Sequence, residues 1–348
     1  MNDTPLARTG ETLVAESGDA RSLVMEWVQP PRFDDELKTL FVESGREDSF
    51  DRYAGVARLL AEVGAGAVLA RTLEGQLAIC TSLLPRSFQD GPQSVRGALL
   101  TGLVVHPSFR DFWTPVNFLR GALQLIEEQG ELDFLYADPG ENGAAVFRAA
   151  SFDLLGSLQN FVFPVVPGWS SYLRHEFPIV QLDAERLSWE AGADQLSALP
   201  HLDSGSAFKV IRTRALHESW IQANRTESSE WIVLRVPGRS GEALPAARVL
   251  LTPTSSGRTL GITDLGWDSE QVSVESLLYA ITGHARSQGF RKLAIRTLRP
   301  SRLGQAMARS GFVGRSGEQP VLTRVVGEDT ILPSPHRWLL TWVDGDYW

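Results

Sequence analysis

The chain has 348 residues, of which 43% are hydrophobic and 22% are charged, and its net charge is -9. This length exceeds the size at which one hydrophobic core usually stops growing, so we expect a globular protein with two domains. The polar first residues and the lack of any run of about 18 apolar residues argue against a signal peptide and a membrane span, which favours a cytoplasmic location with no membrane partner. The single cysteine, Cys80, excludes an internal disulfide and is expected in the core.

The charge is unevenly distributed along the chain. Residues 1–180 carry a net charge of -10, whereas residues 181–348 carry +1. Between Glu275 and Glu318 there are arginines and a lysine but no acidic residue. Such a stretch can attract an anionic ligand such as a nucleotide or pyrophosphate, or it can be a solvated face that forms ion pairs. The acidic remainder of the chain disfavours DNA as a partner.

In chain order, the first half reads as strand, two helices, three strands, helix, strand, helix and strand. Alternating and apolar runs predict strands, and spacings of three and four predict helices. The strands are expected at 22–28, 65–72, 75–84, 96–105, 132–137 and 159–165, and the helices at 33–43, 53–63, 115–130 and 141–150.

The second half repeats this order more faintly. Strands are expected at 209–213, 231–236, 246–253, 259–267, 292–297 and 337–346, and helices at 215–224, 272–289 and 301–310. Two related units explain the repetition. We therefore divide the chain into a polar tail (1–20), a first domain (21–166), a connection rich in Pro, Gly and Ser (167–206) and a second domain (207–348).

Several motifs resemble the GNAT superfamily of acyl-CoA-dependent N-acetyltransferases in its tandem form. In the first half these are L-V-V-H-P-S-F-R and A-D-P-G-E-N-G-A-A-V-F-R-A-A-S-F; in the second they are I-T-D-L, S-Q-G-F-R-K-L-A-I-R, M-A-R-S-G-F and the ending W-L-L-T-W-V-D-G-D. The ending is similar to tandem members linked to sugar and polysaccharide acylation. The resemblance implies an α/β (α+β) fold of two GNAT-like domains, each a mixed, largely antiparallel sheet flanked by helices.

The resemblance also implies that acetyl-CoA or another acyl-CoA is the co-substrate, with its pyrophosphate on main-chain amides at the start of a central helix. It places cofactor contacts at Val104, Val105, Arg110, Trp113, Thr114 and Asn142. Trp113 and Pro115 stand where the family has small residues. A large ring and a missing amide there predict weaker diphosphate binding.

Other positions depart from the family pattern. Phe147 aligns with the tyrosine that protonates the departing thiolate, and Met307 aligns with it in the second half. Thr101 aligns with the general base of the central strand, and W-D-S-E-Q-V-S-V replaces the glycine turn of the second half.

The expected catalytic residues are Thr101 and Asp264. Asp264 lies between apolar neighbours in a strand and could orient an acceptor amine or hydroxyl, or it could cap a turn or pair with an arginine. The expected substrate contacts are Trp267, Trp338, Asp344 and Asp346, because rings at strand ends can stack on sugars and an acidic pair can bind polyols or accept a proton. An ordinary solvated turn is the alternative for the two aspartates. The histidines show no metal-ligand spacing, so no metal is expected.

Three functions remain open at this point. The first is transfer of an acyl group from acyl-CoA to an amine of a small metabolite or an amino sugar. The second is a GNAT-shaped binding or scaffold protein that no longer catalyses, with Trp113 closing the cofactor slot. The third is a Fem-type transferase that uses aminoacyl-tRNA, which would profit from a more basic surface. The sequence does not decide the oligomeric state.

Overall fold

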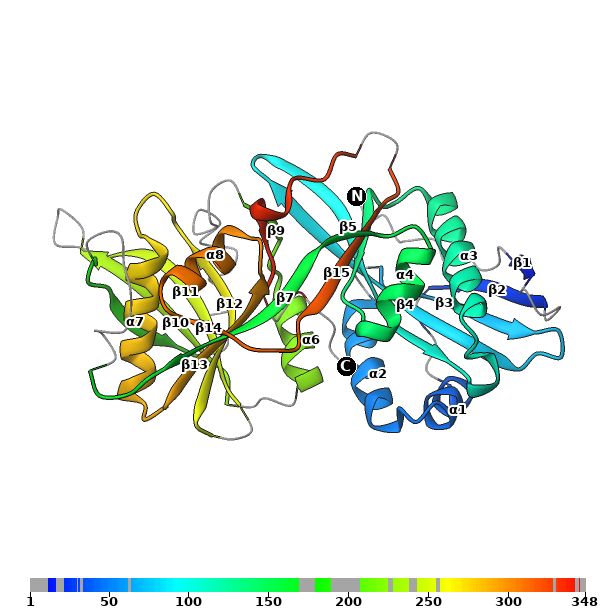
Figure 1. Cartoon of the computed structure of the whole chain (residues 1–348), viewed down its shortest axis with the longest axis horizontal. Coiled ribbons are helices and arrows are strands. Elements are labelled where there is room, and N and C mark those ends of the chain that lie inside the picture. Colours follow the sequence, from blue (N-terminus) through cyan, green and yellow to red (C-terminus); the bar gives the residue numbers. More distant parts are fainter. Residues whose placement is uncertain are drawn as a thin grey trace, which may run out of the picture.

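A computed structural model describes residues 12–16, 22–29, 31, 34–61, 64–168, 179–188, 207–224, 228–237, 243–254, 257–327, 330–341 and 344. Two lobes lie side by side along the long axis and share one 16-stranded sheet (Figure 1). The first lobe contains β1 to β6 with α1 to α4. The second contains β8 and β10 to β13 with α7 and α8.

The elements of the first half follow the predicted order closely. They are β1 (Thr12–Glu16), β2 (Ser22–Val28), α1 (Asp35–Glu43), α2 (Glu47–Leu60), β3 (Gly66–Thr72), β4 (Leu77–Asp90), β5 (Gln93–Val105), the 3-10 helix η2 (Pro107–Phe109), α3 (Trp113–Gln129), β6 (Phe134–Ala137), α4 (Glu141–Ala149) and β7 (Asp153–Pro164).

The second half contains additional short strands. Its elements are β8 (Asp183–Leu187), β9 (Phe208–Val210), α6 (Arg214–Asn224), β10 (Glu230–Pro237), β11 (Ala243–Pro253), β12 (Thr259–Trp267), α7 (Val274–Ser287), β13 (Lys292–Leu298), α8 (Arg302–Arg309), β14 (Val313–Gly314), β15 (Gln319–Val325), the 3-10 helix η5 (Pro335–Arg337) and β16 (Trp338–Leu339).

Helices cover both faces of the first lobe's sheet because its strands are apolar on both faces. Val68 and Ala70 pack in the cluster that contains the buried side of α3, whereas Ala67 and Leu69 pack in the cluster beneath α1 and α2. This is the alternation that a pleated strand imposes on neighbouring side chains. Cys80 lies beneath α1 and α2, fully buried, and burial raises the pKa of its thiol to about 12.

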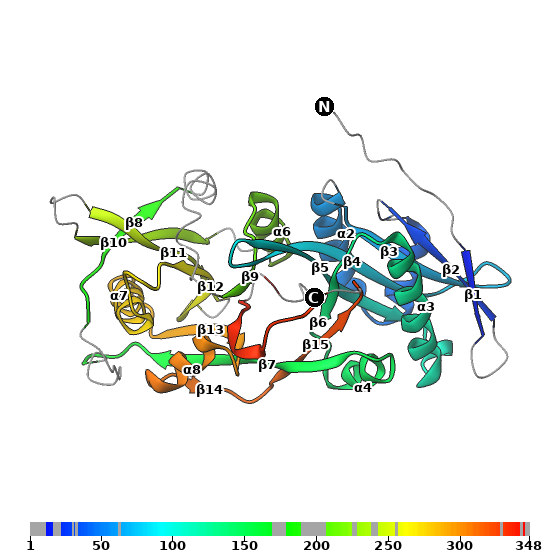
Figure 2. The same cartoon turned by 90° about the horizontal axis from the view of Figure 1, so that it is seen from above.

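The two lobes exchange strands at their junction. β7 crosses into the second lobe and pairs with β13, while β15 comes back from the second half and pairs with both β6 and β7. These long strands run through the middle of the molecule in both views (Figures 1 and 2). α6 packs against α2 at the same junction. The sheet of each lobe is therefore completed by a strand from the other half of the sequence.

Each lobe contains one pair of neighbouring parallel strands that separates partway along its length. β5 pairs with β6 from Gly97 to Leu99 and then continues to Val105 without β6, while it stays paired with β4 on its other side. β12 pairs with β13 from Thr259 to Ile262 and continues to Trp267. Each lobe therefore has a V-shaped gap between two parallel strands.

The predicted final strand at 337–346 differs from the structure. A two-residue strand, β16, follows the 3-10 helix η5, and Trp338 to Thr341 are all buried. Residues 338–341 are apolar because the segment is buried on all sides. Their apolar character therefore does not indicate a long strand with one exposed face. The strand β15, which joins the lobes, was not predicted.

Within the described residues, no helix combines the length and hydrophobicity needed to cross a membrane.

Candidate acyl-CoA site

The gap between β5 and β6 contains a pocket of about 660 Å³. β5 contributes Leu100 to Leu103, and the connection after β6 contributes residues 138 to 143 at the first turn of α4. Residues 317 to 319, which precede and begin β15, close the pocket from the second half of the chain. Residues from both halves of the sequence therefore line this pocket, because β15 pairs within the first lobe.

A β-bulge lies at the wall of this pocket. Cys80 pairs with Val104 and Ser82 pairs with Thr101, so Gly102 and Leu103 together oppose the single residue Thr81. Gly102 has φ of 64°, a left-handed conformation that costs other residues about 1–2 kcal/mol. Bulges redirect main-chain groups and often occur beside active sites. Here the bulge turns β5 at the point where β6 diverges.

Two of the residues expected from the sequence line this pocket. Thr101 is 3% exposed and lies next to the bulge, and Asn142 lies in the first turn of α4. Phe147, at the position of the thiolate-protonating tyrosine, also lines it and carries no proton to donate. The structure thus brings Thr101, Asn142 and Phe147 together around one cavity.

Acidic and basic groups from both halves surround the same pocket. Asp138 is 3% exposed, with a carboxylate oxygen 3.9 Å from the Arg296 guanidinium, and its carbonyl accepts a hydrogen bond from the Gln319 amide. Glu318 pairs with Arg299 at 2.7 Å. Glu141 and Arg46 also line the pocket, so its lining includes three carboxylates and one arginine. This excess of negative charge among the lining residues suits a cationic amine.

The turn after β5 holds its own anion. The Asp111 carboxylate accepts hydrogen bonds from the Thr114 main-chain amide at 2.7 Å and from the Thr114 hydroxyl at 2.5 Å. Burial raises the pKa of Asp111, but the hydrogen bonds from Thr114 and the Trp113 amide outweigh it, so the pKa lies below its ordinary value. The carboxylate thus occupies first-turn amides of α3 where a diphosphate would bind.

The other residues expected to contact the cofactor in and before this turn differ in exposure and in their partners. Arg110 donates to the carbonyls of Val105 and Ser44, at 3.1 and 2.9 Å, so it ties the turn to α1. Trp113 is 55% exposed and forms an edge-to-face pair with Phe112, with ring centroids 5.2 Å apart. Val104 is buried beneath α1 and α2, which leaves only its main chain for a ligand.

The residues expected in the second half lie in a buried ion-pair network. Arg212 pairs with Asp264 at 2.8 Å and with both oxygens of Asp344 at 2.5 and 2.8 Å. His217 contacts the other oxygen of Asp264 at 2.8 Å. Burial raises the pKa of Asp264, but Arg212 and His217 outweigh it and hold the pKa far below its ordinary value. Asp264 therefore pairs with an arginine, which was one of the two roles that the sequence left open, and its carboxylate is buried.

The second gap is filled by the chain's own C-terminal segment. Leu339 packs with Ile295 of β13 and with residues of α8, and the Thr341 hydroxyl lies 3.3 Å from Asp264 of β12. Segment 338–341 thus contacts both strands that border the gap. The two lobes differ in that the first gap is open and the second is packed.

The remaining expected substrate contacts are enclosed or lie outside the described residues. The Trp338 ring is 1% exposed and stands between Phe88, Phe134 and Phe208, so it offers no face to a ligand. Trp267 is 7% exposed. Asp344 is 1% exposed because it pairs with Arg212, whereas Asp346 lies outside the described residues.

Sequence reasoning missed several residues that shape these sites. Asp111 stands three residues before Thr114, which is the spacing of a helix-capping carboxylate and could have been recognised. Asp138 ends a buried strand just before Pro139 and Gly140, which also marks a strand-end loop. Arg212 gave no such signal, because its partners are 52 and 132 residues away. Among the described residues, no group of three or more His, Cys, Asp or Glu side chains is arranged to hold a metal ion.

Comparison with solved structures identifies the fold. The chain is similar to a probable N-acyltransferase from Enterococcus faecalis V583, with a TM-score of 0.61 and 12% identity over 87% of this chain and 72% of that chain. It is also similar to a tandem GNAT protein from the clavulanic acid biosynthesis pathway, with a TM-score of 0.54 and 12% identity over 88% of this chain and all of that one. The chain has a tandem GNAT fold.

Another GNAT protein gives the same result. A GCN5-related N-acetyltransferase from Anabaena variabilis ATCC 29413 is 17% identical, with a TM-score of 0.61 and coverage of 87% of this chain and 73% of that chain. The sequence itself matches no protein-family model and no curated protein. At this level of identity the likeness establishes the tandem GNAT fold, and the site must be argued from its own residues.

Proposed function

We propose that the protein transfers an acyl group from acyl-CoA to the amine of a small metabolite or amino sugar, at the gap between β5 and β6. The observation that carries this proposal is the open 660 Å³ pocket at the point where these parallel strands separate, beside the bulge at Gly102. In the reaction the amine nitrogen forms a bond to the acyl carbon, the carbon–sulfur bond breaks, and the thiolate leaves with a proton.

Positioning supplies most of what this reaction needs. An extended pantetheine arm would lie between the diverging strands, which brings its thioester next to Thr101. The Thr101 hydroxyl would orient the thioester or the attacking amine. The carboxylates of Asp138 and Glu318 would attract a cationic amine, and one of them would accept its proton before attack. Because Phe147 has no proton to give, the thiolate would take its proton from the amine or from water.

A second candidate function is a GNAT-shaped binding or scaffold protein that does not catalyse and whose acyl-CoA slot is closed. The Asp111 carboxylate on the first turn of α3 supports it, since a fixed anion there opposes a diphosphate. Phe147 at the proton-donor position supports it as well. The two candidates differ in whether incubation with acetyl-CoA and amines releases free CoA.

The pocket proposal is tested by filling the pocket from a position that tolerates it. Gly140 lines the pocket, has φ of -62°, and has no atom within 4 Å of an added Cβ, so Gly140→Trp should fold and block the gap. Wild-type protein should melt several degrees higher with millimolar acetyl-CoA, at about 1–2 °C per kcal/mol of binding energy for a chain of 348 residues. Gly140→Trp should lose this shift.

The matched control places the same ring elsewhere. Leu73 is 70% exposed in the turn before β4, so Leu73→Trp should keep the full shift with acetyl-CoA. Release of CoA thiol with a panel of amines and amino sugars then separates catalysis from binding. A wild-type protein whose melting temperature is unchanged by acetyl-CoA and by longer acyl-CoAs would contradict the proposal.

A further inference from the structure

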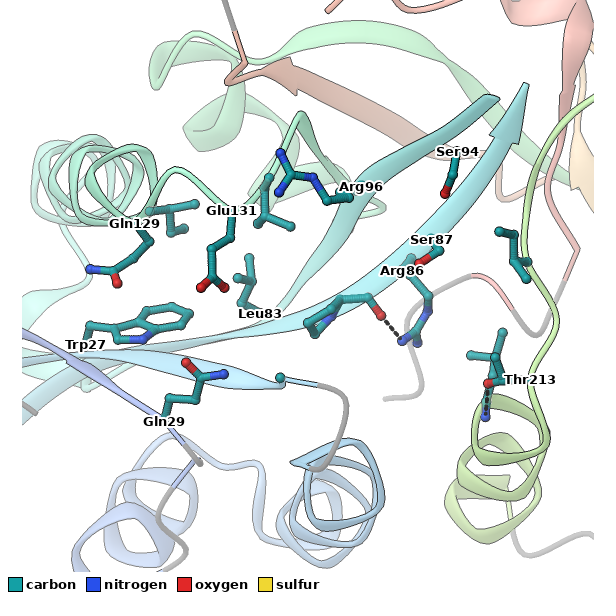
Figure 3. A pocket seen from close by; sticks show the side chains of 17 residues that line it. Trp27, Gln29, Leu83, Arg86, Ser87, Ser94, Arg96, Gln129, Glu131 and Thr213 are labelled. Carbon is teal, nitrogen blue, oxygen red and sulfur yellow. Dashed lines mark hydrogen bonds between the residues drawn. The ribbon is translucent and has the colours of Figure 1, made fainter. Parts of the chain in front are cut away.

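A second cavity lies at an interruption in the edge pairing of β4. Strand β3 pairs with β4 up to Leu83, and the Ile211 amide donates to the Ser87 carbonyl at 2.7 Å. Between these points, no described strand pairs with residues 84 to 86 on that side of β4. A cavity of about 360 Å³ occupies the notch, and Gly64 is among the residues that line it. Thr213 borders it at the start of α6 (Figure 3).

The notch interrupts the sheet without leaving its backbone exposed to an incoming strand. Pro85 lies in the interruption and has no amide to donate, and its carbonyl accepts a hydrogen bond from the Arg86 guanidinium at 3.0 Å. Proline at an edge position discourages strand addition. Addition of a peptide strand at this edge is therefore disfavoured, and the cavity has room for a small molecule.

The floor of the cavity is apolar and includes a fixed indole ring. Leu83, Ile126 and Leu132 line it together with Trp27. The Trp27 ring lies directly over Gly66, where an added Cβ would come within 2.3 Å of it. The ring is thus held against the backbone of β3 by a glycine that leaves room for it, and a preset aromatic surface suits an apolar ligand body.

The polar groups of the cavity carry opposite charges. Arg86 is 5% exposed, and the Glu131 carboxylate points toward the Trp27 ring (Figure 3). Glu131 forms no ion pair with any described residue. Arg96 also borders the cavity, but it pairs with Asp133 at 3.2 Å. The amides of Gln29 and Gln129 add neutral donors and acceptors at the end where Trp27 lies.

We propose that this cavity binds a small zwitterion with an apolar body, the chemistry of an apolar amino acid. Its ammonium group pairs with Glu131 over the Trp27 ring, its carboxylate is directed to Arg86, and its apolar body covers Leu83 and Ile126. The cavity shares no lining residue with the pocket between β5 and β6. The inference therefore does not rest on the proposed acyl transfer.

Calorimetric titration of the full chain with three probes tests this site. L-phenylalanine carries both charges, 2-phenylethylamine only the positive one and 3-phenylpropanoate only the negative one. L-phenylalanine should bind about tenfold more tightly than either analogue, because only it engages both charged walls. Equal affinities for all three probes, or no heat from any of them at millimolar concentration, would overturn the proposal.

Variants then assign the charges. Glu131→Gln should weaken L-phenylalanine and 2-phenylethylamine about tenfold and leave 3-phenylpropanoate unchanged. Glu128→Gln is the matched control, because Glu128 contacts Gln124 and does not line the cavity. Gly140→Trp should leave L-phenylalanine binding intact, whether or not acyl-CoA binds. Loss of L-phenylalanine binding in either control variant would overturn the assignment.

Discussion

At the scale of single residues, Asp111 controls what the start of α3 can bind. Its carboxylate takes the amide of Thr114, which a CoA diphosphate would otherwise use. Asp111→Ala should raise the affinity for CoA about tenfold or more, because it frees amide donors and removes a repelling charge. Pantetheine, which lacks the diphosphate, is the control ligand, and its affinity should not change. Equal CoA affinity in both proteins by calorimetry would contradict this role.

The same residue predicts a pH dependence of stability. The pKa of Asp111 is lowered in the folded protein, so its contribution to stability is present above the unfolded pKa of about 4 and is lost as pH falls through the folded pKa. Asp111→Ala should cost about 1 kcal/mol at pH 7, the usual value of a helix cap. The difference between the two proteins in urea unfolding should shrink toward pH 3. A difference that persists at pH 3 would show that the cap does not depend on its charge.

At the scale of elements, the C-terminal segment is fixed to β12 through Arg212. Arg212→Met would leave Asp264 and Asp344 as buried carboxylates without their arginine, and breaking a buried pair in this way costs about 3–5 kcal/mol. Arg214→Met is the matched control, because the Arg214 side chain is 54% exposed and pairs with Glu218 on the helix surface. The control should cost under about 0.5 kcal/mol. The midpoints of urea unfolding measure the stability of the two variants. Similar midpoints would contradict a stabilising role for the buried ion-pair network of Arg212.

At the scale of the whole molecule, strand exchange should make the two halves one folding unit. A fragment of residues 1–166 keeps β6 but lacks β15, and it exposes β7 without β13. Unpaired strand edges of this kind promote aggregation. The fragment alone should be insoluble or lack a cooperative melt, whereas the full chain should unfold in one transition. Co-expression with residues 167–348 should recover soluble protein.

The oligomeric state and the melting transition of the isolated fragment 1–166 test this prediction. A monomeric fragment 1–166 with a sharp melting transition would show that its sheet closes without β15. The first domain predicted from the sequence, 21–166, would then be an independent folding unit. Circular dichroism and analytical ultracentrifugation of the fragment distinguish the two outcomes.

The sequence by itself determined most of the longer elements and, through the family resemblance, the fold class. Periodicity along β3, β4 and α3 is a local signal, set by neighbours within a few residues, and it predicted these elements. The family resemblance of motifs such as V-H-P-S-F-R predicted the tandem GNAT fold. The resemblance also singled out Thr101 and Asn142, and the structure shows that both line one pocket.

Only the tertiary structure decided which strands complete each lobe and which gap stays open. The exchange of β7 and β15, the enclosure of Trp338 and the pairing of Arg212 with Asp264 and Asp344 join residues far apart in the chain. Such pairings depend on how whole elements pack. A buried ion pair or a filled gap gives no periodic pattern in the sequence around the residues that form it. For that reason the sequence left two roles open for Asp264, and only the fold shows that its buried carboxylate pairs with Arg212 and His217.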